Sequence, residues 1–402
     1  MADKRVVITG LGVLSSCGIG KEAFWEAIFS GSSGIKPISL FDTQPFKAKS
    51  AGEIKDFKPQ DFLGVKGLRT LDRSTKLAAS ATYLALEDTK LKISEENTRD
   101  IGVAIGTTLG SVNSISEFDK EAIKEGPHYV NPALFSNTVI NSPASQVSIK
   151  FNIKGFNATI STGFSAGLDA INYAADFLRL SRAKIVLAGA VEELCIQTFL
   201  GFYKTGLLAG TNDALPEISC PFDKRRNGFI LGEGSAILVL EDLESALARQ
   251  AKIYAEVSGF GMGFGRNSLK KAMRLSLEEA KVSADNIDYI CAGANSSVDS
   301  DLIEAEAIKD VFGNLADKVS VSSIKSVTGE CFSASGSLQV AASVGAIEKQ
   351  MIPPTINYEQ KDPECNLNHI TNKAQERKVE KVLINAFAPS GVNSSLIISR
   401  FN

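Results

Sequence analysis

Short runs of β-branched and other apolar residues alternate with longer amphipathic stretches along the whole chain. In the first part, the apolar runs predict strands at residues 5–9, 101–106, 158–161, 184–188 and 235–240. Strands that alternate with helical patterns are typical of an α/β fold.

The pattern begins again in the second part of the chain. A helix and connection are predicted at 242–252, and strands follow at 253–260, 287–292, 318–323 and 381–387. Residues 319–348 repeat the order of 158–178: a strand, a turn of small residues, and a helix with small residues and one apolar face. We therefore predict two related halves, 1–250 and 251–402, whose matching helices form a buried pair at a pseudo-two-fold axis.

The turn within 158–178 is the most informative local feature. A strand that ends at a helix N-terminus directs backbone N–H groups and the positive end of the helix dipole at one side chain, which suits a thiolate or an anionic intermediate. Phe164 occupies that place, and a benzyl group can use none of those interactions. Residues 163–167 also read G-x-S-x-G, the nucleophile elbow of hydrolases, but the only downstream histidine is His369, so a capping or packing hydroxyl is the simpler interpretation of Ser165.

Composition and charge exclude several classes of protein. The 402 residues are 44% hydrophobic, which allows a large core, and 43 basic against 46 acidic residues create no basic field for nucleic acid. No apolar run approaches the roughly 20 residues that span a bilayer, so we expect a cytoplasmic protein.

Six cysteines without a C-x-x-C pair and two histidines predict free thiols and no zinc site. The glycines at 10–12 and 228–234 lack the rest of a dinucleotide or phosphate motif, and no cofactor is expected.

Seven motifs, taken in order, resemble the β-ketoacyl synthases, the condensing enzymes of fatty acid and polyketide synthesis. They are VVITGLGVLSSCGIG, LDRSTKLAASATYLALEDTKL, CPFDKRRNGFILGEGSAILVLED, YICAGANSSVDSDLIEAEAI, VSSIKSVTGE, PPTINY and INAFAPSGVNSSL. The resemblance covers essentially the whole chain. It implies the thiolase fold, with two duplicated halves stacked as α-β-α-β-α layers, and dimerisation along a strand.

The same resemblance implies that the catalytic groups are lost. The family's nucleophilic cysteine, in T-A-C-A/S-S/T-G, corresponds to Phe164, and the histidine of N-A-H-G-T-S/A-T corresponds to Gly293. Glu330 stands where K-S-x-x-G-H has its histidine, and a carboxylate there is expected to repel the malonyl carboxylate and the enolate. Pro389 lies in the loop whose backbone N–H assists the acyl oxygen, and proline has no N–H.

A retained fold without catalytic groups resembles the chain-length factors, inactive ketosynthase-like subunits that pair with an active ketosynthase and shape its acyl tunnel. The A-G-L-D-A run at 166–170 is common in those subunits, although they often carry glutamine where Phe164 stands. We expect a heterodimer with an active ketosynthase, and acyl carrier protein bound through that complex. Lys325 and Glu304 are retained and are expected to form a buried ion pair. Residues expected at the tunnel or the subunit interface, with core packing as the alternative, are Leu109, Phe135, Phe199 and Phe202.

Two other functions stay open. One is an acyl-thioester hydrolase or decarboxylase that uses Ser165 or Glu330. The other is a homodimeric acyl-binding or scaffold protein that needs no catalytic partner.

Overall fold

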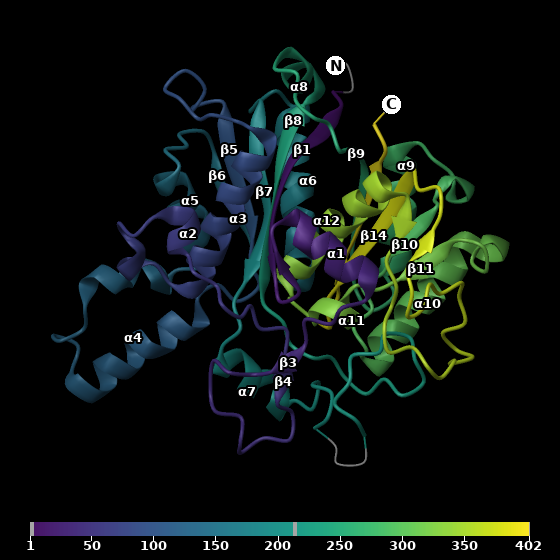
Figure 1. Ribbon diagram of the computed structural model, residues 1–402, viewed down its shortest axis with the longest axis horizontal. Helices are drawn as coiled ribbons and strands as arrows, with labels where there is room; N and C mark the ends of the chain where they lie inside the picture. Colours follow the sequence, from purple (N-terminus) through teal and green to yellow (C-terminus); the bar gives the residue numbers. More distant parts are fainter. Residues whose placement is uncertain (1–3, 212–214, 402) are drawn as a thin grey trace.

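Two sets of five strands with the same topology build the sheet in a computed structural model that describes residues 4–211 and 215–401 (Figure 1). The first set has the spatial order β6–β5–β7–β8–β1 and comprises β1 (Val6–Ser15), β5 (Ile101–Gly106), β6 (Asn157–Ile160), β7 (Ile185–Glu192) and β8 (Gly234–Asp242). The second has the order β11–β10–β14–β15–β9 and comprises β9 (Ala255–Phe264), β10 (Tyr289–Cys291), β11 (Ser320–Ser322), β14 (Lys381–Phe387) and β15 (Val392–Ser399). With strands numbered along the chain within each set, both orders read 3-2-4-5-1, which confirms the duplicated halves. The exact boundary at residue 250 stays a prediction.

Helices form three layers around these two sets of strands. The middle layer holds α6 (Ala166–Arg179) and α12 (Ser333–Lys349), which contact β7 in one half and β15 in the other. On the outer face of the first half lie α3 (Arg73–Thr89) and α5 (Ser142–Lys150). On the second lies α9 (Leu269–Ala280), with α10 (Val298–Phe312) beside it (Figure 1). The layers therefore follow the α-β-α-β-α order of the thiolase-like fold.

The helices α6 and α12 form the buried pair that the repeat predicts. A Cβ atom on Gly167 would lie 2.3 Å from the carbonyl oxygen of Ser333, and one on Gly336 would lie 3.0 Å from the side chain of Leu168. Since real Cβ atoms do not approach backbone atoms to 2.3 Å, glycine is required at residue 167 for this separation of the helices, and a side chain at residue 336 would press on Leu168. The α12 helix is buried from Ser333 to Ile347, as expected for the central layer.

Most predicted strands lie where the apolar runs placed them, but their ends differ. The largest extension is in β1, which continues to Ser15 because it pairs with β8 as far as Gly234. The predicted helix at 242–252 is shorter and forms α8 (Leu243–Ala248).

The remaining elements are short or lie at the edges of the layers. The helices are α1 (Lys21–Ser30), α2 (Gln60–Leu63), α4 (Val112–Glu125), α7 (Ile196–Lys204), α11 (Lys325–Thr328), η1 (Leu68–Thr70), η2 (Pro132–Thr138), η3 (Gly163–Ser165), η4 (Ala284–Asn286) and η5 (Gly313–Leu315). The strands are β2 (Gly18–Ile19), β3 (Lys36–Pro37), β4 (Ser50–Ala51), β12 (Met351–Ile352) and β13 (Gln375–Glu376). Within the described ranges, no helix is long and apolar enough to cross a membrane.

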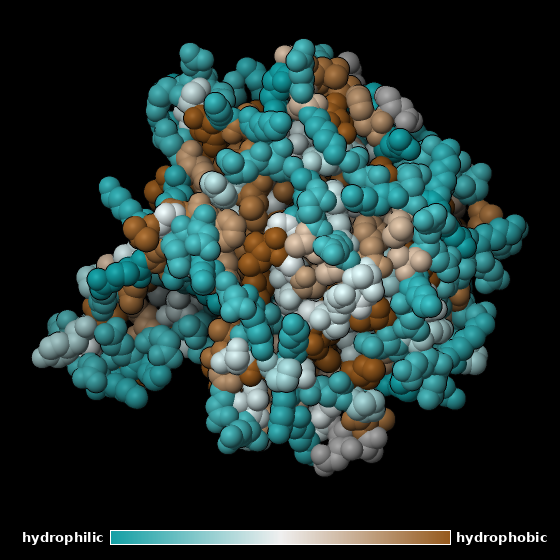
Figure 2. Space-filling model, in the orientation of Figure 1, coloured by the Kyte–Doolittle hydropathy of each residue, from teal (hydrophilic) through white to brown (hydrophobic). Residues whose placement is uncertain are grey.

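One segment stands out from the body of the molecule. Residues 112–138, from the start of α4 to the end of η2, are called the arm, and the space-filling view shows it projecting at the left (Figures 1 and 2). No residue of α4 is buried. The placement of α4 therefore depends on the segments at its ends and on its contacts with α7 and η2.

Candidate functional site

Phe164 lies in η3, between β6 and α6, where the strand-turn-helix pattern placed it. The side chain is buried, and its ring centroid lies 4.7 Å from that of Phe332, 6.2 Å from that of Phe202 and 6.4 Å from that of Phe229. All three contacts are edge-to-face, a geometry in which each aromatic pair contributes about 0.5–1.5 kcal/mol beyond its buried area. The position at the helix N-terminus therefore presents an aromatic cluster and no nucleophile.

Phe332 was not predicted as a site residue from the sequence, although it lies two residues after Glu330. Its backbone has φ 49° and ψ −120°, a strained conformation for a bulky residue. Its ring stacks on Phe202 with a centroid separation of 5.0 Å, and its N–H donates to Glu330 Oε1 at 2.9 Å. The residues at two substituted positions, Phe164 and Glu330, thus both contact the strained residue Phe332.

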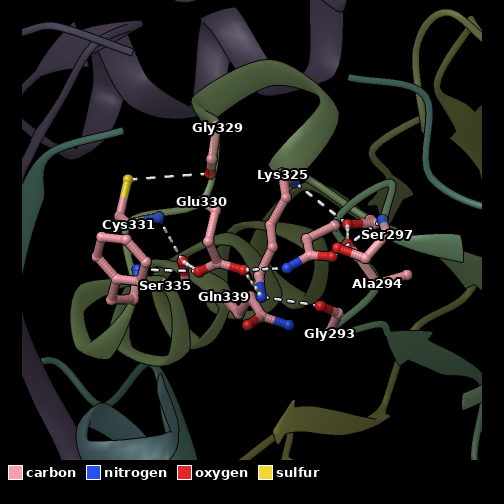
Figure 3. Close-up of polar contacts among 12 residues, drawn as sticks. Gly293, Ala294, Ser297, Lys325, Gly329, Glu330, Cys331, Ser335 and Gln339 are labelled. Atoms are coloured by element: carbon pink, nitrogen blue, oxygen red, sulfur yellow. Dashed lines mark hydrogen bonds and ion pairs between the residues drawn. The ribbon is translucent and has the colours of Figure 1, made fainter. Parts of the chain in front are cut away.

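The Glu330 carboxylate is buried and fully hydrogen bonded (Figure 3). Its Oε2 atom accepts from Lys325 Nζ at 2.8 Å and from Asn295 Nδ2 at 2.9 Å. Its Oε1 atom accepts from the Phe332 N–H and, at 2.8 Å, from Ser335 Oγ. The negative charge is therefore balanced by Lys325 within the protein.

The predicted ion pair between Lys325 and Glu304 is wrong. Lys325 Nζ binds Glu330 and donates to the carbonyl oxygen of Gly293 at 2.8 Å. Glu304 instead accepts from the N–H groups of Gly293 at 3.0 Å and Ala294 at 2.7 Å, and from Asn385 Nδ2 at 2.9 Å. Burial raises the pKa of Glu304 to about 7. Lys325 thus binds the carbonyl group of Gly293 and Glu304 binds its N–H group, while the charge partner of the lysine is Glu330, just after α11.

Gly293 leaves no room for an imidazole. A Cβ atom at this position would lie 2.8 Å from the carbonyl oxygen of Asn385 and 2.8 Å from a ring carbon of Phe387. The Phe387 ring therefore occupies the space that a histidine side chain would need.

Pro389 is exposed in the segment that follows β14. It lines a cavity of about 540 Å³ together with Phe229, Phe387 and polar residues such as Arg266 and Asp299. Among the described residues that line this cavity, Phe164 is absent. The cavity therefore borders the aromatic cluster at Phe229 without reaching the vacated nucleophile position.

Ser165 belongs to a buried polar cluster that contains no imidazole among the described residues. Its hydroxyl donates to Asp169 Oδ2 at 2.9 Å, and Asp169 also accepts from Thr162 Oγ1. His369 packs on Phe222, and its Nε2 donates to the carbonyl oxygen of Cys365 at 2.7 Å. Burial lowers the pKa of His369 to about 4. The residues of a serine hydrolase triad are therefore not brought together.

The four predicted tunnel residues lie in two places. Leu109, Phe199 and Phe202 belong to the same apolar cluster as Phe164. Phe135 lies on the arm, is 60% exposed, and has its ring centroid 6.2 Å from that of Phe118. A tunnel or interface role stays a prediction for all four.

The described part of the chain offers no group of three His, Cys, Asp or Glu side chains that could hold a metal ion. The six cysteines are unpaired, and all but Cys17 are buried, as predicted. Burial raises the pKa of the Cys220 and Cys291 thiols to about 11, so these sulfurs are protonated at neutral pH.

Comparison with known proteins places this geometry in a family. The models for the β-ketoacyl synthase N-terminal and C-terminal domains match residues 3–246 and 254–359. The 3-oxoacyl-(acyl-carrier-protein) synthase 2 of Coxiella burnetii is 38% identical, with 100% of this chain and 99% of the relative covered. The solved ishigamide ketosynthase/chain length factor has a TM-score of 0.93 and 33% identity, with 100% of both chains covered. One chain of a solved complex, described as a type II polyketide synthase acyl-carrier protein with its ketosynthase bound to the hexaketide, matches with a TM-score of 0.90 and 31% identity, covering 99% of this chain and 100% of that chain. Matches of this extent show that the chain belongs to the β-ketoacyl synthase family.

Proposed function

We propose that this chain is a non-catalytic, chain-length-factor-like subunit that pairs with an active β-ketoacyl synthase in fatty acid or polyketide elongation. The observation that carries the proposal is the filling of the three catalytic positions. An aromatic cluster surrounds Phe164, the Phe387 ring excludes a side chain at Gly293, and Glu330 forms an ion pair with Lys325.

Condensation needs groups that these positions do not supply. A thiolate must take the acyl chain, and neutral donors must stabilise the thioester oxygen as the malonyl carboxylate leaves. The ring of Phe164 forms no thioester, and Pro389 has no N–H to donate. Loss of one oxyanion donor alone costs about 3 kcal/mol of transition-state stabilisation. We therefore propose that the side chains at these positions only stabilise the fold of this chain, and that the partner carries out catalysis.

An open sheet edge supports the existence of a partner. The first set of strands ends at β6, whose residues are exposed or half-buried and which pairs with β5 among the described residues. Three aromatic rings lie nearby: Phe156 and Phe177 are half-buried with centroids 4.1 Å apart, and Tyr173 is exposed. Because an open edge presents unpaired N–H and C=O groups, it favours addition of a strand from another chain. We propose that β6 and these rings face the active ketosynthase.

Co-expression with an active ketosynthase from the same organism tests the proposal. We expect the two chains to co-purify as a heterodimer. After incubation with acyl and malonyl carrier-protein thioesters, intact-mass spectrometry should find the acyl adduct on the partner and none on this chain.

A matched control uses the partner with its nucleophilic cysteine replaced by alanine. The complex should still form but release no product, because this chain supplies no nucleophile. A stable homodimer that never takes up the partner would contradict the proposal and favour a scaffold. Turnover by the isolated chain that is lost in Ser165→Ala would instead support the hydrolase.

A further inference from the structure

The hydroxyl group of Thr108 joins three segments around the filled site. Thr108 Oγ1 donates to the carbonyl oxygen of Gly163 at 3.1 Å, and it accepts from the N–H of Ser333 at 3.0 Å. Gly163 immediately precedes Phe164, and Ser333 immediately follows Phe332 and opens α12. One side chain thus connects the end of β5 to both backbone segments that carry the aromatic cluster.

The Glu192 carboxylate holds the same segment from the end of β7. It accepts from the N–H of Thr108 at 2.8 Å, from the N–H of Leu109 at 3.1 Å and from Ser333 Oγ at 2.7 Å. Glu192 is 1% exposed, so these bonds are shielded from water. Burial raises the pKa of this carboxyl, and the hydrogen bonds from the segment and from α12 oppose that shift.

The segment held in this way is the base of the arm. Residues 107–111 run from β5 directly into α4, and Ser111 Oγ at their end donates to Asp72 Oδ2. Leu109, in the middle, packs against the cluster that contains Phe164. Since α4 has no buried residue of its own, these bonds at the base help to hold the arm, together with the contacts of α4 with α7 and the hydrogen bond from Asn137 Nδ2 in η2 to the carbonyl oxygen of Thr70.

We propose that Thr108 is a positioning residue: its hydroxyl keeps Leu109 and the base of the arm in a fixed place relative to the filled site. The effect on product length rests on the proposed function. In the heterodimer, the fixed Leu109 and arm limit the space for the partner's growing acyl chain, and they keep the distribution of product lengths narrow.

Two substitutions of Thr108 separate the hydroxyl from the rest of the side chain. Thr108→Val keeps the size but leaves the Gly163 carbonyl and the Ser333 N–H without this partner, whereas Thr108→Ser keeps the hydroxyl. Thr138→Val is the matched control, because it removes a single hydroxyl bond, to the Phe135 carbonyl at 2.8 Å, at the far end of the arm.

Hydrogen exchange of the isolated full chain tests the positioning without a partner. We expect backbone amides at 109–125 to exchange at least about tenfold faster in Thr108→Val, since the loss of even one of the two hydrogen bonds has an effect of about that size. Exchange in Thr108→Ser and Thr138→Val should match the wild type over the same residues, and β8 should be unaffected in all variants. Unchanged exchange at 109–125 in Thr108→Val would overturn the inference.

Product analysis of the co-expressed complex tests the functional consequence. The Thr108→Val complex should assemble as the wild type does and release a broader distribution of product lengths, with Thr108→Ser restoring the narrow one. If the complex assembles and the distribution is unchanged, the specificity role of Thr108 is wrong. If the wild-type chain forms no complex at all, the proposed function is wrong, and the exchange result still decides whether Thr108 positions the arm.

Discussion

Replacement of Glu330 by alanine should strongly destabilise the protein. The variant leaves the Lys325 ammonium buried, with the Gly293 carbonyl as its remaining hydrogen-bond partner among those described. It also removes the acceptor for Asn295 Nδ2, the Phe332 N–H and Ser335 Oγ. Removal of one partner of a buried ion pair costs about 3–5 kcal/mol, because an uncompensated charge stays in the interior.

A surface ion pair in another part of the chain provides the matched control. Glu348, near the end of α12, binds Lys252 Nζ at 2.6 Å, but the lysine side chain is 58% exposed. Glu348→Ala should therefore cost less than about 1 kcal/mol. The double variant Lys325→Met/Glu330→Leu removes both buried charges, and it should recover most of the stability that Glu330→Ala loses.

Urea denaturation followed by tryptophan fluorescence measures these differences. Trp25 is the single tryptophan, and its Nε1 donates to the Ala341 carbonyl of α12 at 2.8 Å. Its emission therefore reports the separation of α1 from α12, and circular dichroism checks that the same transition is followed. The reasoning is refuted if Glu330→Ala costs no more than Glu348→Ala, or if the double variant is as unstable as Glu330→Ala.

Three further variants test other parts of the molecule. Phe164→Ala should lower the free energy of unfolding by about 3–5 kcal/mol, since it empties the centre of an aromatic cluster, and a loss below about 1 kcal/mol in the same assay would contradict that packing. Gly293→Ala should cost about 1–3 kcal/mol because its Cβ meets the Phe387 ring, whereas Gly201→Ala, whose Cβ meets nothing within 4 Å, should be neutral or stabilising; equal effects would show that residue 293 is not confined. Burial, with the nearby Asp72 charge, raises the pKa of Glu193 to about 8, above its unfolded value, so this carboxyl lowers stability as pH rises from about 4.5 to 8. Glu193→Gln should therefore gain stability relative to the wild type across that range, with a slope of at most about 1.4 kcal/mol per pH unit, and a constant difference between the two denaturation series would count against the raised pKa.

Local patterns predicted the elements well where one face or the whole run is apolar. The strand at 101–106 and the strand at 381–387 have the predicted ends, and the helix after Ser165 extends only one residue beyond Leu178. The ends of β1 could not be read in this way, because its extension depends on pairing with β8, which is more than 200 residues away in the chain. Apolar periodicity indicates that a segment is buried, but it does not indicate how long the strand that pairs with it is.

The candidate site, too, could be predicted only in part from the sequence. Motif order identified the family and the substituted positions Phe164, Gly293, Glu330 and Pro389 from residue identities alone. It did not identify the charge partner of Lys325, since two carboxylates, the retained Glu304 and the substituted Glu330, were available and only the backbone path decides which one meets the ammonium group. A contact between side chains depends on distances of a few ångströms, which spacing along the chain does not specify.

The sequence by itself therefore determined the α/β class, the duplication, the family and the absence of a cysteine and two histidines at the family's catalytic positions. Only the tertiary structure decided what took their place: rings from η3, α7 and the start of α12 in contact, a Phe387 ring against Gly293, and a carboxylate neutralised by Lys325. The physical reason is that the loss of a catalytic group can be recognised from the identity of a single residue. A filled and charge-balanced site depends instead on side chains from segments that meet only when the two halves pack together.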